Sequence, residues 1–123
     1  AVSESKNVLE TLFKLILEER GQLPSGYVPL APMFDLVASA LDLKADAVPG
    51  NPDASEEVSR ILSGLVTTVS GINKTRNELG TGHGQHDATD PDARHARLVF
   101  NATVAVGEFL IATLAELDER SDG

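Results

Sequence analysis

Residues 54–79 read ASEEVSRILSGLVTTVSGINKTRNEL, and this stretch predicts a long amphipathic helix. Its apolar residues recur every three or four positions, which is the period of one face of an α-helix. They are Val58, Ile61, Leu62, Leu65, Val69, Ile72 and Leu79. Asp53 and Glu56 resemble a capping pair at the start of this helix. A polar break rich in glycine follows at Gly80–Asp90.

The segments on either side show the same period. We expect further helices at Ser3–Arg20, Ala31–Leu43 and Pro91–Asp118, with loops at Gln22–Pro29 and Ala45–Pro52. Gly21 is a plausible C-terminal stop, and Asp90-Pro91 has the residues of an N-cap and a first helical position. Because no segment alternates like a strand, the sequence predicts an all-α fold. The expected architecture is an antiparallel bundle of four to five helices whose core comes from the first, third and fourth segments.

The last helical segment has two apolar faces. One face comprises His95, Leu98, Val99, Ala102, Val106, Phe109 and Leu110, and the other comprises Phe100, Val104, Gly107 and Ile111. A surface helix needs only one such face. The second face is therefore covered either by another helix of the same chain or by a second copy, and we expect a homodimer.

Composition narrows the function classes. The 123 residues fit one domain, residues 1–123, and the formal net charge is −9. Such an acidic chain is a poor candidate for broad DNA or RNA binding, which relies on phosphate neutralisation. The absence of cysteine fits the cytoplasm, and no uninterrupted run of about 18 apolar residues predicts a membrane span.

The residues most suited to chemistry lie between Arg76 and His95. Arg76 falls near the centre of the apolar stripe at its helix end, so it meets a buried anionic partner, reaches an edge, or forms a helix-end salt bridge. Glycines 80, 82 and 84 let the chain turn back, so that His83 approaches Arg76. An arginine binds phosphate with a planar fork, and a histidine exchanges protons near neutral pH.

Other catalytic patterns are absent from the sequence. The serines are scattered without a recognisable triad partner, and the three glycines do not form a phosphate-binding loop. His83, His86, Asp87 and His95 contain metal-binding side chains, but their spacing matches no common metal signature. We therefore predict neither a metal nor a cofactor.

The string from Arg76 to Gly84, RNELGTGHG, resembles the RNxLGxxHG signature of the abortive-infection C-terminal domain family, part of the HEPN superfamily. Two further segments are similar to that family: the first helix, through Ser5–Glu10 and Ile16–Gly21, and DARHARLVFNA at 92–102. The resemblance covers roughly Lys6 to Leu117. It implies a helical HEPN-like domain that acts in phage defence or in a toxin-like system.

The resemblance also implies roles for residues. It implies metal-independent RNA cleavage in which the ribose 2′-hydroxyl attacks the adjacent phosphate, in a cleft shared by two protomers. His83 would act as general acid or base, Arg76 would hold the phosphate, and Asn77 would orient the pair or bond the substrate. Supporting or substrate-binding roles fall to Gly80, Gly82, Gly84, Arg94, His95 and Asn101.

Two departures from the family pattern keep an alternative open. Glu78 stands where a basic residue is common, and the loop after Gly84 is neutral to acidic, which weakens its attraction for a polyanion. The alternative is a non-catalytic HEPN module that binds a nucleotide or a partner protein and drives dimerisation. An antitoxin and a fused partner domain are further candidate partners.

Overall fold

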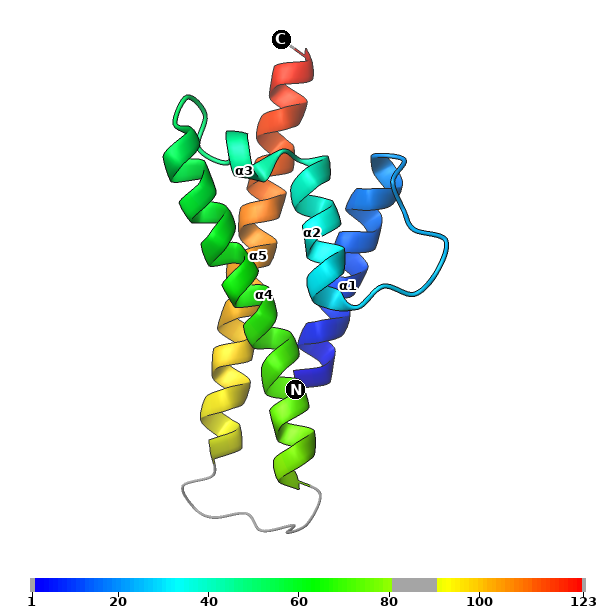
Figure 1. Cartoon of the computed structure of the whole chain (residues 1–123), viewed down its shortest axis with the longest axis vertical. Helices are drawn as coiled ribbons and strands as arrows, with labels where there is room; N and C mark the ends of the chain where they lie inside the picture. Colours follow the sequence, from blue (N-terminus) through cyan, green and yellow to red (C-terminus); the bar gives the residue numbers. More distant parts are fainter. Residues whose placement is uncertain (1, 81–90, 123) are drawn as a thin grey trace.

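The structure, a computed structural model, describes the backbone of residues 2–80 and 91–122 and the side chains of residues 4–71 and 93–120. Within these residues the chain is all-helical and has no strand, as predicted (Figure 1). The helices are α1 (Val2–Glu19), α2 (Leu30–Ala40), α3 (Leu43–Asp46), α4 (Pro52–Gly80) and α5 (Pro91–Asp122).

Local signals explain most helix ends. Gly21 has a φ of +70°, and the N–H groups of Gly21 and Gln22 donate to the carbonyls of Glu18 (3.1 Å) and Leu17 (2.8 Å). This is the paired hydrogen-bond pattern of a glycine-terminated helix, so the predicted stop is confirmed. Pro91 is the first residue of α5, also as predicted.

The predicted cap of the long helix is wrong. The side-chain oxygen of Asn51 accepts a hydrogen bond from the Ala54 N–H at 3.1 Å, so Asn51 caps α4. Pro52 then occupies the first helical position, where its missing N–H costs nothing. The helix thus begins before Asp53, which lies inside its first turn.

The second predicted helix is shorter than expected. It ends at Ala40, and Asp42 follows in the left-handed conformation with φ 54° and ψ 43°. This reversal starts α3 in a stretch that the sequence assigned partly to a loop. The turn buries Leu41 and Leu43 in the core.

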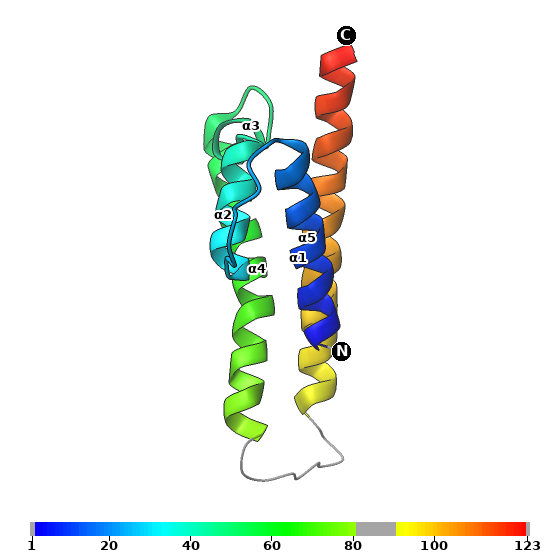
Figure 2. The same ribbon diagram turned by 90° about the vertical axis from the view of Figure 1, so that its right-hand side faces the viewer.

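The helices lie side by side along one long axis. In Figure 1, α4 runs downward and α5 runs upward beside it, so the two helices form an antiparallel pair. The segment 21–29 passes back along the bundle, so α1 and α2 both run in the direction of α5. Figure 2 shows α4 and α5 on opposite sides of the bundle with α1 between them in front.

The core includes the second helix, which the sequence analysis left out. Met33, Phe34 and Val37 of α2 are buried, and the Phe34 ring lies 5.7 Å from that of Phe13 on α1. On α4 the predicted face is rotated slightly: Ile61 is 60% exposed, whereas Val66, which the predicted stripe omitted, is buried. On α5, Leu98 is 50% exposed although we expected it in the core.

The second apolar face of α5 is not covered by the described residues of this chain. Phe100 and Ile111 are each 60% exposed, and Val104 is 38% exposed. The helical segment Ala93–Arg120 is long and apolar enough, by length and composition, to cross a membrane. The sequence analysis predicted no membrane span because it looked for an uninterrupted apolar run, whereas the apolar residues of this segment are spread over two faces of a helix. A core helix passes the same test, and one face of α5 is indeed buried in the bundle.

Candidate functional site

The structure places the predicted catalytic residues only in part. Arg76, Asn77 and Gly80 belong to the C-terminal end of α4, and their side chains lie outside the described residues. The described residues also exclude 81–90, which contains Gly82, His83 and Gly84. We expect Gly80–Asp90 to be the most mobile internal segment, and this prediction lies outside the described residues as well. The approach of His83 to Arg76 therefore stays a prediction.

The backbone does bring the two motif-bearing helix ends to one end of the bundle. The last turns of α4 and the first turns of α5 both lie at the lower end in Figures 1 and 2. Arg76 is four residues from the end of α4, and Arg94 is three residues from the start of α5. The helix turns that carry Arg76 and Arg94 thus lie at the same end of the bundle.

The second family segment divides over two sides of α5. Arg94 and Asn101 are exposed and seven residues apart, so they share one side of the helix. His95 is half-buried and lies on a different side from Arg94, toward the bundle. The described part of the chain therefore places Arg94 with Asn101 and separates both from His95.

Arg97 belongs with Arg94 and Asn101, and sequence reasoning missed it. It follows Arg94 by three residues on the same exposed side. Neither arginine forms an ion pair with a described residue. The signal available in the sequence was the helical spacing of residues 94, 97 and 101.

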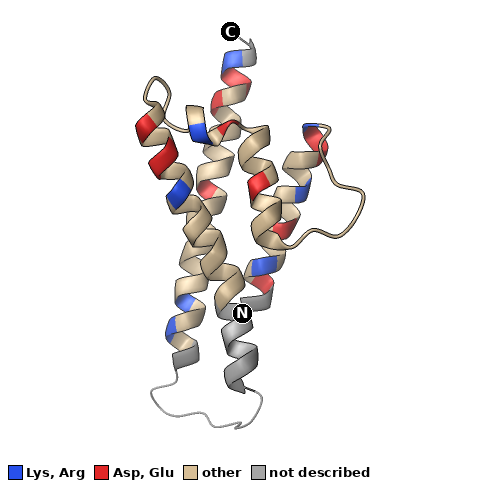
Figure 3. Cartoon of the chain, in the orientation of Figure 1, with Lys and Arg blue, Asp and Glu red and all other residues tan. Residues whose placement is uncertain are grey.

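The described side chains of α4 and α5 nearest this end include no carboxylate. Residues 61–71 and 93–107 contain no Asp or Glu. The acids of α4 and α5 concentrate toward the other end, where the carboxylate of Asp46 binds Arg120 at 2.8 Å (Figure 3). Arg94 and Arg97 thus have no described carboxylate paired with them, and such guanidinium groups suit the binding of a phosphate.

No metal centre is seen among the described side chains. They contain no group of three His, Asp or Glu residues placed to hold a metal ion. Of the four side chains considered above as metal ligands, His83, His86, Asp87 and His95, only His95 lies among the described side chains.

One comparison with known proteins bears on the site. The family model Abi_C, described as a HEPN-like domain, matches residues 1–114. The match includes α1 to α4, the Arg76–Gly84 motif and most of α5. No curated protein and no solved structure matches the chain.

Proposed function

Because the chain belongs to the Abi_C family of HEPN-like domains, we propose that it is a metal-independent ribonuclease that acts in the cytoplasm as an effector of phage defence or of a toxin-like system. The observation that carries the proposal is the intact Arg76, Asn77 and His83 set in the sequence, and it is supported by Arg94 and Arg97, which form no ion pair with a described residue.

The reaction follows from these residue types. His83 removes the proton from a ribose 2′-hydroxyl, or protonates the leaving 5′-oxygen. The 2′-oxygen then attacks the adjacent phosphorus and expels the 5′-oxygen, which leaves a 2′,3′-cyclic phosphate on one product and a 5′-hydroxyl on the other. Arg76 stabilises the negative charge that develops on the phosphoryl oxygens. Arg94, Arg97 and Asn101 bind the flanking RNA backbone.

A homodimer fits this activity. Phe100, Val104 and Ile111 form an exposed apolar stripe on α5, and the neighbouring helix α1 exposes Val8 (58%) and Leu15 (59%). A monomer gains nothing from leaving such a surface in water, and a second copy would bury it. Pairing through α5 also brings two copies of the helix that begins beside the motif into one assembly.

The alternative is a non-catalytic HEPN module that binds a nucleotide or a partner protein, such as an antitoxin or a fused domain. It is favoured by Glu78 and by the acids at 87, 90 and 92, which oppose a polyanion near the motif. This reading keeps the dimer and the phosphate-binding arginines, but it removes the proton transfer by His83.

A cleavage assay with total RNA and excess chelator distinguishes the two functions. We expect cleavage that survives the chelator and leaves 2′,3′-cyclic phosphate ends. His83→Ala and Arg76→Ala abolish it, and Arg76→Lys is nearly inactive because an ammonium group cannot bind phosphate through two parallel hydrogen bonds.

The matched control is Arg60→Ala on the same helix. Arg60 pairs with Glu56 and Glu57 near the opposite end, so its loss should leave cleavage unchanged. Intact RNA at micromolar protein with a normal helical spectrum would favour the non-catalytic module. Cleavage that persists in His83→Ala would exclude the proposed site.

A further inference from the structure

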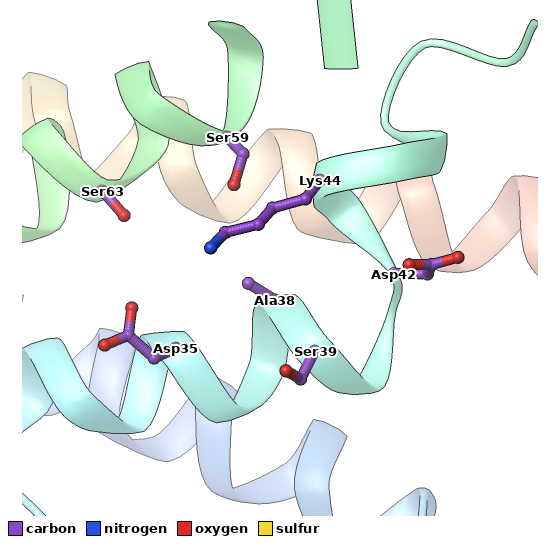
Figure 4. Close-up of a pocket in the computed structure, with 7 residues that line it drawn as sticks. All are labelled: Asp35, Ala38, Ser39, Asp42, Lys44, Ser59 and Ser63. Carbon is purple, nitrogen blue, oxygen red and sulfur yellow. The ribbon is translucent and has the colours of Figure 1, made fainter. Parts of the chain in front are cut away.

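A polar cavity of about 440 Å³ lies between α2, α3 and α4, away from the motif-bearing end. Its walls are Asp35, Ala38 and Ser39 of α2, Asp42 and Lys44 at α3, and Ser59 and Ser63 of α4 (Figure 4). The volume is in the range of small-molecule sites. None of these residues belongs to the family segments described above.

Small polar side chains on α4 create the space. Ser55, Ser59 and Ser63 follow one another at four-residue spacing, so they form a row on one face of the helix. The hydroxyl of Ser55 is satisfied: it accepts from the Val48 N–H at 2.8 Å and lies 3.0 Å from the carbonyl oxygens of Val48 and Asn51. Ser55 therefore connects α4 to the preceding loop through hydrogen bonds, whereas Ser59 and Ser63 line the cavity.

Ser59 differs from Ser55 in having no partner. It is only 5% exposed, yet its hydroxyl makes no hydrogen bond with any residue in the described part of the chain. In Figure 4 this hydroxyl points into the cavity toward the Lys44 side chain. No buried side-chain oxygen or nitrogen of the described residues lacks a hydrogen-bond partner, so the Ser59 hydroxyl is reached by solvent from the cavity and is available to a polar ligand.

Charges of both signs face the same space without pairing. The Lys44 side chain extends across the cavity, and its ammonium group points toward the region between Asp35 and Ser63 (Figure 4). No ion pair joins Lys44 to Asp35 or to any other described acid. The cavity therefore offers a cation, a carboxylate and hydroxyl groups at separate positions.

We propose that this cavity binds a small zwitterion of the free amino acid type. The ligand carboxylate lies against the Lys44 ammonium and accepts hydrogen bonds from Ser59 and Ser63, while its ammonium group lies against Asp35. A simple anion would face Asp35, and a simple cation would face Lys44, so a ligand with one charge leaves a repulsive contact. The proposal is independent of the nuclease activity.

The probe is L-alanine. Two analogues serve as comparisons: propionate, which lacks the ammonium group, and ethylamine, which lacks the carboxylate. Titrated into the isotope-labelled full chain, L-alanine should produce saturable NMR shifts of the amides of residues 35–44 and 59–63. The two single-charge analogues should bind at least about tenfold more weakly, since each loses one charged hydrogen-bonding partner.

Substitutions complete the test. Lys44→Met and Asp35→Asn should each weaken L-alanine binding by about tenfold or more. Lys14→Met is the matched control: Lys14 lies on α1, paired with Glu10, and its loss changes the net charge equally. The proposal is overturned if L-alanine gives no saturable shifts, if propionate binds equally well, or if Lys44→Met binds like the unmodified chain.

Discussion

Ser55 and Ser59 lie one turn apart on α4, and both are buried, but only Ser55 has hydrogen-bond partners. Ser55→Ala leaves the Val48 N–H without its acceptor, so we expect a loss of about 1–3 kcal/mol in the free energy of unfolding. Ser59→Ala removes no partner and should change that energy by less than about 1 kcal/mol, or raise it. Urea unfolding of the two variants measures the difference. Equal losses would show that the Ser59 hydroxyl is bonded within the folded chain.

At the scale of the elements, glycines contribute differently at a helix end and inside a helix. Gly21 ends α1 with φ +70°, and a Cβ there would meet no atom within 4 Å. Gly21→Ala should therefore cost about 1 kcal/mol through backbone strain alone. Gly64 lies within α4 with equally free space, so Gly64→Ala should stabilise by up to about 1 kcal/mol. Thermal unfolding of both variants checks this, and a stabilising Gly21→Ala would contradict the positive φ.

The whole molecule has one apolar face on α5 that the described chain leaves uncovered, and the proposed dimer predicts how it responds to charge. Val104→Glu places a carboxylate in the middle of the exposed stripe and should convert the dimer to monomer, as measured by light scattering at micromolar concentration. Ala105→Glu adds the same charge at an exposed neighbouring position off the stripe, and it should remain dimeric. A dimer that survives Val104→Glu uses another surface, and a monomeric unmodified chain contradicts the dimer itself.

The candidate site was predictable only as far as it depends on a local motif. Arg76, Asn77 and His83 stand out because a short string of residues carries the family resemblance. Arg94, Arg97 and Asn101 lie together because of helical geometry. Whether an acidic side chain pairs with the two arginines depends on how the neighbouring helices pack, which the sequence does not show. Serines at 59 and 63 looked unremarkable in sequence, since a cavity exists only once α2 and α3 face them.

Sequence by itself determined the helical fold, the stop at Gly21 and the start at Pro91, because each depends on residues within a few positions of one another. It also determined the family, whose model matches residues 1–114 without any tertiary information. Tertiary structure alone decided that Val66 rather than Ile61 enters the core, that α2 contributes to it, and that one side of α5 stays uncovered. The physical reason is that the sequence period defines an apolar stripe that is wider than the surface which one neighbouring helix can cover. The neighbouring helices choose which part of that stripe is removed from water.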